Sequence, residues 1–169
     1  MIAHKFLRAD GTSPFTRFHW EPPDEGPGDW VEEPADPCRS GVHACRPGDL
    51  PYWAGEALFE IELEGEVVES ARKLVATRGR LLRRLGAWED GVRQAYQAMC
   101  AERAHLIASE GGPTLEKWDV MVDPFTAQGP GPAGFCAARI AEEVRGPDAF
   151  DAERAAQAAW LAERLRLEL

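Results

Sequence analysis

The sequence predicts an α+β fold: a mainly antiparallel twisted sheet in the strand-rich half, residues 1–85, packed against helices from the helical half, residues 86–169. Residues 58–69, LFEIELEGEVVE, alternate apolar and acidic side chains, as a strand with one buried face does. Apolar residues in the second half instead recur at helical spacing. The chain of 169 residues is long enough for one domain with a core, so we expect a single domain, 1–169.

The first strand is expected in MIAHKFLRA, which Asp10-Gly11 ends, and a second in FTRFHW, residues 15–20, whose side chains alternate. The next 17 residues hold five prolines and two glycines, which is typical of a surface loop. A short strand around Trp30-Val31 can interrupt this loop. Further along the chain, GDLPYWAGE predicts a short helix that Asp49 caps and that carries Pro51 in its first turn.

Two longer strands follow. In LFEIELEGEVVE the apolar side chains lie on one face and Glu60, Glu62 and Glu64 on the other. KLVATRGRLLRRL, residues 73–85, continues the strand pattern, with Gly79 as an interruption.

The helical half begins with AWEDGVRQAYQAMCAERAHLIASE, a predicted helix that carries an apolar stripe and that Gly111-Gly112-Pro113 ends. LEKWDVMV is ambiguous, TAQGPGPAG is predicted to be a linker, and FCAARIAEEV is predicted to be helical. A last helix is expected to start at Asp148 or Asp151. The expected apolar stripes are Trp88, Val92, Tyr96 and Met99; then Cys136, Ile140 and Val144; then Trp160, Leu161 and Leu165.

Charge and hydropathy restrict the possible partners. The formal net charge of −10 argues against non-specific binding to nucleic acid or to anionic membranes. No apolar run is long enough to span a membrane, and we identify no signal peptide, so we expect a cytoplasmic protein with reduced cysteines. No motif indicates a cofactor, because GPGPAG at 129–134 is interrupted by proline and matches neither nucleotide fingerprint.

The segment CRSGVHAC, residues 38–45, is the first candidate site. If Ser40-Gly41 is a two-residue hairpin loop, Cys38 pairs with His43, and alternation places Asp36, Cys38, His43 and Cys45 on one face. A thiol beside an imidazole can be activated as a nucleophile, so Cys38 and His43 are the candidate catalytic pair, with Cys45 as a ligand contact.

Three other interpretations of this segment stay open. Cysteines often only fill space in a core, and structural packing is the interpretation of this segment that we favour. The same side chains could bind zinc, although their spacing is not a standard zinc motif. A Cys38–Cys45 disulfide is disfavoured by the diagonal spacing and by a reducing compartment.

A basic strip lies within the acidic chain, from Arg72 to Arg84. Arg78, Arg80 and Arg84 share one strand face and could bind a phosphate or carboxylate, with Tyr52 and Trp53 forming the floor of a pocket for a flat anion. His19 could join such a polar pocket. The alternative, which we favour, is that the strip pairs with the glutamate face of the preceding strand.

The chain resembles a group of uncharacterised actinobacterial proteins and a small phage and bacterial domain of unknown function. The resemblance is carried by the order of six segments: KFLR, FHW, CRSGVHAC, LPYW, LFEIELEGEVV and KLVATRGRL. The resemblance covers about residues 4–82 and implies a compact intracellular module, without a known activity. The turn Gly41-Val42-His43 before an aromatic segment is also similar to ADP-ribosyltransferases. The chain has neither a catalytic glutamate after the corresponding strand nor a histidine and tyrosine in that family's order.

These observations lead to one functional hypothesis and several alternatives. The leading hypothesis is a small-molecule-binding protein, or an enzyme acting on a small anionic substrate, with Cys38 and His43 as the reactive pair and Arg78 or Arg80 as the anion contact. The alternatives are a non-catalytic protein-interaction module, a metal-site enzyme and an ADP-ribosyltransferase-like protein.

Overall fold

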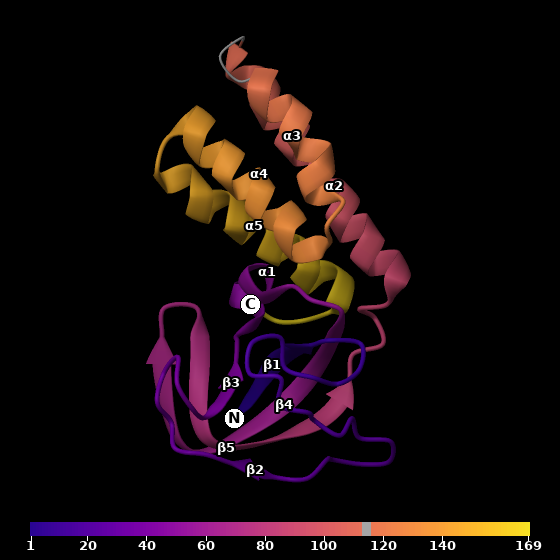
Figure 1. Ribbon diagram of the computed structural model, residues 1–169, viewed down its shortest axis with the longest axis vertical. Coiled ribbons are helices and arrows are strands. Elements are labelled where there is room, and N and C mark those ends of the chain that lie inside the picture. The colour runs from indigo at the N-terminus through magenta and orange to yellow at the C-terminus, as the bar shows by residue number, and fades with distance from the viewer. Residues whose placement is uncertain (113–115) are drawn as a thin grey trace. The chain divides into compact units, whose positions relative to one another are not determined.

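The computed structural model describes residues 1–112 and 116–169 and confirms the α+β class (Figure 1). The chain divides into two compact units. The sheet unit comprises Met1–Trp88 together with Glu168–Leu169, and the helical unit comprises Glu89–Leu167.

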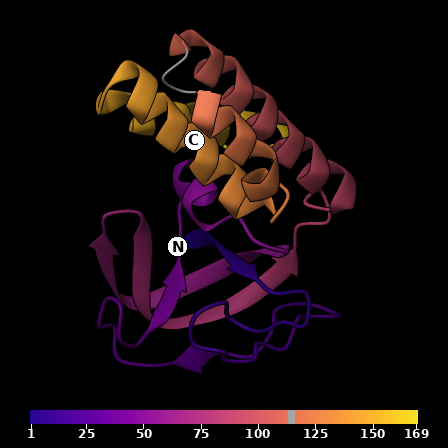
Figure 2. The same cartoon turned by 45° about the horizontal axis from the view of Figure 1, so that its top comes forward.

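Within the described residues, the sheet unit contains a five-stranded antiparallel sheet. Its strands are β1 (Ile2–Leu7), β2 (Val31–Glu32), β3 (Val42–Ala44), β4 (Ala57–Ser70) and β5 (Lys73–Arg84). The long strands β4 and β5 form a hairpin (Figure 2), as their alternating patterns predict. β1 pairs with the other edge of β4, and both β2 and β3 pair with β5.

The sheet curls until its first strand meets β3. One bridge joins them: His4 N donates to Cys45 O at 2.9 Å, and Cys45 N donates to His4 O at 2.8 Å. This single point of pairing, which we call the seam, is where the site described below opens.

The core of the sheet unit follows the strand alternation. Ala3 and Leu7 of β1 pack in one cluster with Phe59, Ile61 and Leu63 of β4, all of them almost fully buried. Because successive side chains of a strand point to opposite faces, Lys5 shares the inward face of β1 with Ala3 and Leu7. A lysine therefore points to the side of the sheet that holds the core.

The prediction of a strand in FTRFHW is wrong. Residues 13–18 form a turn in which Ser13 N donates to Phe18 O at 2.8 Å, and the turn is closed by a bridge between Thr12 and His19. Pro14 and the left-handed conformation of Arg17, at φ 57°, are incompatible with an extended strand. The short helix predicted in GDLPYWAGE is confirmed as a 3₁₀ turn, Pro47–Asp49, followed by α1, Leu50–Trp53.

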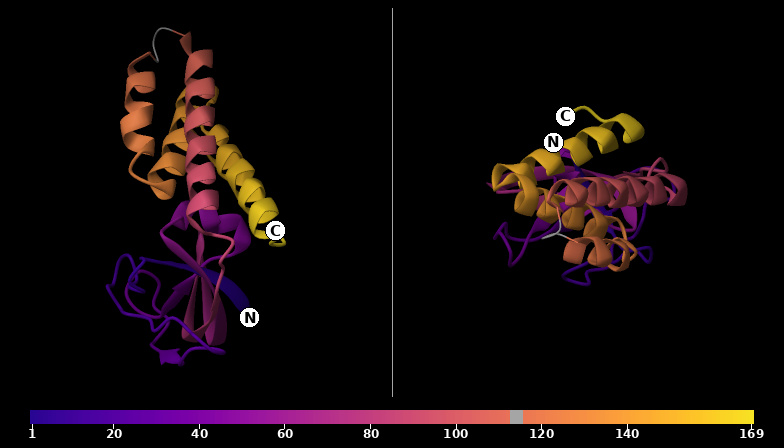
Figure 3. Two further views of the ribbon diagram at one scale, coloured as in Figure 1. Left: turned by 90° about the vertical axis from the view of Figure 1, so that its right-hand side faces the viewer. Right: turned by 90° about the horizontal axis from the view of Figure 1, so that it is seen from above.

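The helical unit contains α2 (Asp90–Glu110), α3 (Glu116–Thr126), α4 (Pro130–Arg145) and α5 (Asp148–Leu165). Helix α4 packs against the other three (Figure 3). The predicted linker is partly wrong, because Pro130 begins α4; proline suits a first helical position, where its missing N–H needs no partner. None of the described helices is long and apolar enough to cross a membrane.

The predicted end of α2 is confirmed, since the helix stops at Glu110 before Gly111, whereas Pro113 lies outside the described residues. The apolar stripe of α2 differs from the prediction. Trp88 precedes the helix and belongs to the sheet unit, and the buried stripe is Tyr96, Cys100, Ala104 and Ile107.

Candidate functional site

The turn before β3 does not have the predicted register. The chain reverses over residues 37–39, closed by a bridge between Asp36 and Ser40, and β3 pairs with β5, so that His43 lies opposite Val75 rather than Cys38. Pairing with the long β5 strand buries Val42, which a short hairpin would not do. Glycine is needed at position 41, where the chain passes close to β5. Its φ is 98°, and a Cβ there would lie 2.7 Å from Val75 Cγ1.

The turn nevertheless borders a cavity of about 600 Å³. We call it the seam cavity, because its walls are β1, β3 and the 13–20 loop around the single bridge between His4 and Cys45. Of the predicted site residues, the cavity lining includes Cys38, His43, Cys45 and Trp53.

Lys5 is the buried cation of the seam cavity, whose lining also includes Lys73 and Arg39. Only 8% of the residue is exposed, its Nζ donates to the His43 backbone oxygen at 2.7 Å, and the ammonium lies 5.0 Å from the centroid of the Trp20 ring. Among the described residues, no carboxylate forms an ion pair with Lys5. Burial therefore dominates and lowers the pKa of Lys5 to about 8.

Two further polar side chains line the same cavity. Lys73 Nζ lies 3.1 Å from Cys38 Sγ. The Cys38 thiol therefore contacts an amine from β5. The half-buried imidazole of His43 has its pKa lowered by burial and by the nearby Lys73 and Lys5 ammonium groups. His43 is consequently neutral at pH 7 and able to accept a proton.

The two residues of the seam bridge, His4 and Cys45, are both buried in this wall. Burial raises the pKa of Cys45 to about 12, so its thiol stays protonated and unreactive. His4 is 5% exposed, and in the described part of the chain neither of its ring nitrogens has a hydrogen-bond partner. Burial lowers the pKa of His4 as well, which keeps this imidazole neutral.

Aromatic side chains supply much of the remaining wall. Phe18 meets Trp20 edge-on, with ring centroids 5.4 Å apart, and Trp20 Nε1 donates to Ser13 Oγ at 3.0 Å. Phe15 meets Trp53 in the same way at 6.2 Å. A cavity with flat apolar walls and a few charged atoms is typical of a small-molecule site.

The arginine strip pairs with the glutamate face of β4, as we favoured. Arg78 lies 3.0 Å from Glu64, and Arg80 lies 2.8 Å from Glu62. Both guanidinium groups also stack over the Trp30 ring, at 4.1 and 4.4 Å from its centroid. Neither arginine lines the seam cavity.

One detail of the predicted strip is wrong. A register shift between Glu60 and Ile61 moves Arg83, not Arg84, onto the face of Arg78 and Arg80, where it pairs with Glu60 at 2.5 Å. The cause is a β-bulge, which inserts one residue and inverts the alternation beyond it.

The remaining predicted contacts lie outside the cavity lining. His19 is exposed at its bridge with Thr12, and the Tyr52 ring is covered by the Arg72 guanidinium at 4.6 Å. Asp36, expected on the same face as Cys38, lies 3.9 Å from Arg39. The cavity therefore gathers the sulfur and imidazole groups of the prediction without its arginines.

Our sequence reasoning missed the two lysines of the site. Lys5 and Lys73 are the only lysines among residues 1–88, which otherwise carry arginine as their basic residue. The strand alternation could have identified Lys5, because it lies on the same face of the first strand as the apolar residues Ala3 and Leu7.

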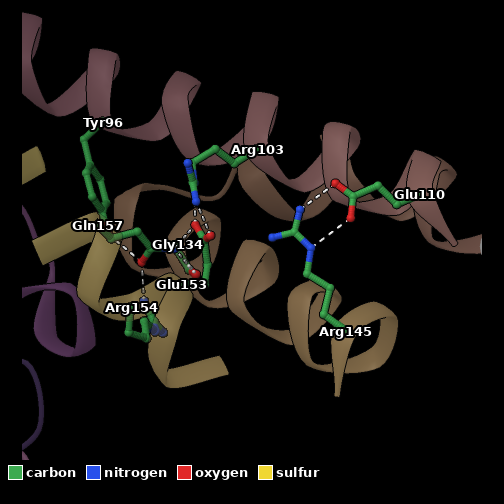
Figure 4. Close-up of polar contacts among 8 residues, drawn as sticks. All are labelled: Tyr96, Arg103, Glu110, Gly134, Arg145, Glu153, Arg154 and Gln157. Carbon is green, nitrogen blue, oxygen red and sulfur yellow. Dashed lines mark hydrogen bonds and ion pairs between the residues drawn. The ribbon is translucent and has the colours of Figure 1, made fainter. Parts of the chain in front are cut away.

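A second cluster of buried polar groups lies in the helical unit (Figure 4). Glu153 accepts two hydrogen bonds from Arg103, at 2.7 and 2.6 Å, and one from Gln157 Nε2 at 3.1 Å. The Gln157 amide also donates to Gly134 O at 3.0 Å and accepts from Tyr96 Oη at 3.2 Å. The Arg103 and Glu153 charges in this cluster are thus matched within the fold.

Among the described residues, no group of three or more histidine, cysteine, aspartate or glutamate side chains is placed to hold a metal ion. The four cysteines are not joined in disulfides, as the sequence predicted. No protein-family model, curated protein or solved structure matches the chain. The resemblance of residues 4–82 to actinobacterial proteins and to the small phage and bacterial domain stays a prediction.

Proposed function

We propose that the sheet unit binds a small anionic molecule with a flat apolar body in the seam cavity. The observation that carries this proposal is Lys5, a buried lysine that forms no ion pair with any described carboxylate. A buried ammonium loses its hydration, so it is retained at a cost in stability unless an anion compensates it. An anionic ligand in the cavity supplies that compensation.

The scarcity of unpaired cations strengthens the argument. The chain has 29 acidic and 19 basic side chains, and arginines of the sheet unit such as Arg78 and Arg80 are held by glutamates. Lys73, like Lys5, lines the cavity and has no described carboxylate partner. The lining also includes Glu33, but neither lysine forms an ion pair with it or with another described carboxylate. In an acid-rich chain, two such lysines in one cavity favour an anion brought from outside.

Shape and chemistry agree with a flat ligand. The cavity of about 600 Å³ lies within the range of roughly 300–1,000 Å³ that small-molecule sites occupy. Trp20, Phe18 and Trp53 offer ring faces and edges on which a planar apolar body can pack. Cys38 and His43 line the same cavity, so a ligand bound there lies beside the predicted reactive pair.

The proposal is tested by titrating the protein with benzoate and terephthalate, and with their uncharged amides, by calorimetry and tryptophan fluorescence. We expect the anions to bind and the amides to bind at least about tenfold more weakly, because one hydrogen bond to a charged group contributes roughly 1.5–3 kcal/mol. Lys5→Met should weaken anion binding at least about tenfold and leave amide binding unchanged, while Lys73 still lines the cavity.

Arg80→Met is the matched control, since it removes a cation of the same unit that lies outside the cavity lining. Its anion affinity should equal that of the wild type. Equal binding of anions and amides contradicts the proposal. A larger loss in Arg80→Met than in Lys5→Met would instead return the anion site to the arginine strip.

A further inference from the structure

We propose that Lys5 is a covalent site, at which carbonyl-bearing members of the anionic ligand class are captured as an imine on Nζ. The inference rests on the proposed function and deepens it, because it names the reactive group of the ligand and the atom that it meets. A lysine amine attacks a carbonyl only when it is unprotonated, accessible to the ligand and not engaged with a carboxylate.

The surroundings of Lys5 meet these requirements. Its side chain lines the seam cavity, and its described polar contact is the His43 backbone oxygen at 2.7 Å. That hydrogen bond uses one N–H of an amine and fixes the nitrogen at the cavity wall. The lowered pKa of about 8 leaves about a tenth of the Lys5 amine neutral at pH 7, whereas an ordinary lysine is almost fully protonated there.

Two neighbours can assist the reaction. His43 is half-buried in the same wall and neutral at pH 7, so its imidazole can take up a proton and return it. Lys73 presents an ammonium to the same cavity and can hold the carboxylate of the ligand.

The step balances without an oxidant or reductant. The Lys5 Nζ lone pair forms a bond to the carbonyl carbon while the C=O π pair moves to oxygen. Transfer of one proton from nitrogen to that oxygen gives a neutral carbinolamine. The hydroxyl then takes up a proton relayed by His43 and leaves as water, while the nitrogen lone pair forms the C=N bond. The remaining N–H proton passes to His43, which replaces the proton that was relayed and leaves the neutral imine.

The experiment incubates the full chain with 4-formylbenzoate, a flat anionic aldehyde, in the presence of cyanoborohydride, and locates the adduct by peptide mass spectrometry. We expect Lys5 to carry the reduced adduct at about tenfold or greater excess over Lys73, because its amine is more often neutral. Terephthalate, which has the same ring and charge but no aldehyde, should compete with the labelling.

The controls come from the other amines of the chain. The Met1 α-amine, which donates to Leu63 O at 2.7 Å, is an internal competitor that reports unselective reaction. Lys5→Arg keeps a cation and should abolish the adduct, whereas Lys73→Arg should retain it, with circular dichroism confirming that both variants are folded. If Met1, Lys73 and Lys117 each carry as much adduct as Lys5, the reaction is unselective and the inference is overturned.

The outcomes separate this inference from the proposed function. If terephthalate binds in a Lys5-dependent way but the aldehyde leaves no adduct on Lys5, imine capture is wrong and anion binding stands. If neither anion binds and Lys5 is not labelled, both are wrong. Because the wild-type peptide map alone decides the question, the result does not depend on whether a variant folds.

Discussion

The seam cavity and the polar cluster of the helical unit bury charged groups in two different ways. In the helical unit, Glu153 is 2% exposed in its side chain, yet it accepts both ends of the Arg103 guanidinium. In the seam cavity, Lys5 is buried to a similar degree but has no described carboxylate partner. The first charge has a counter-ion within the fold, whereas the second has a backbone oxygen and an aromatic ring as contacts but no described counter-ion.

The comparison shows how structural and functional burial of charge can be told apart. A buried ion pair that is complete within the fold becomes costly only when one partner is removed. A buried cation without a counter-ion lowers stability in the folded protein itself, which makes it a candidate for binding something that the chain does not contain. Four measurements test this distinction.

The largest effect is expected for Arg103→Met, which leaves the buried Glu153 carboxylate without its partner. The free energy of unfolding of the helical unit should fall by roughly 3–5 kcal/mol, measured by urea denaturation. Arg145→Met is the matched control, because Arg145 makes the same two-pronged contact with Glu110 on the surface, at 2.8 and 2.5 Å. Its stability should be close to that of the wild type. Equal losses of stability in the two variants would show that burial of Glu153 does not make its ion pair with Arg103 more important than the exposed pair.

For Lys5→Met at pH 7 we expect the free energy of unfolding to rise rather than fall. Burial lowers the Lys5 pKa from 10.5 to about 8, which corresponds to a penalty of about 3 kcal/mol for keeping the buried amine protonated. Removing the charge should therefore raise the free energy of unfolding by up to that amount while anion binding is lost. A loss of stability instead would mean that the fold already satisfies Lys5.

An intermediate effect is expected where the helical cluster is most tightly packed. A Cβ on Gly134 would lie 2.6 Å from Tyr96 Oη and 2.9 Å from Gln157 Oε1. Gly134→Ala should lower stability by about 2 kcal/mol through overpacking, as seen in thermal or urea denaturation. Gly91→Ala, at a position of α2 with nothing within 4 Å, should leave the protein as stable or slightly more stable.

The smallest effect is a pH dependence of the Lys5 contribution. Between pH 8 and 9 the folded protein loses the Lys5 proton, while the unfolded chain keeps it until about 10.5. The unfolded state then binds more protons, so stability rises with pH by about 1 kcal/mol over this interval. Cys45 and Cys100 oppose this rise from about pH 8 upward, because their buried thiols keep their protons to about 12 while the unfolded chain loses them near pH 9.

Lys5→Met isolates this term, since Cys45, His43 and Lys73 are retained in both proteins. The stability advantage of the variant at pH 8 should shrink by about 1 kcal/mol at pH 9. A difference that stays constant with pH would place the Lys5 pKa outside this window.

The helices and long strands were largely predictable, because their signals are local. The alternation of Phe59, Ile61 and Leu63 with glutamates specifies one buried face of β4 whatever else surrounds it. The pairing of Glu62 with Arg80 follows from adjacency in the chain. The strand expected in FTRFHW failed, because Pro14 and a left-handed Arg17 make a turn, which alternation does not report.

The candidate site was only partly predictable. Cys38 and His43 stood out as reactive residue types, and both line the seam cavity. Their predicted pairing across Ser40-Gly41 was wrong, because β3 pairs with β5, about 30 residues later in the chain. Lys5 and Lys73 were missed for the same reason, since each lies far from residues 38–45 in sequence and meets them only across strands.

Residue order alone predicts an acidic chain, a strand-rich half followed by helices, and a glutamate-bearing strand paired with an arginine-bearing one. Which of the charged side chains find partners depends on the folded arrangement. Pairing in a sheet depends on register over long separations, and a curled sheet brings β1 to β3 without any local signal. The burial of Lys5 in the same cavity wall as His43 and Lys73 is a consequence of that closure.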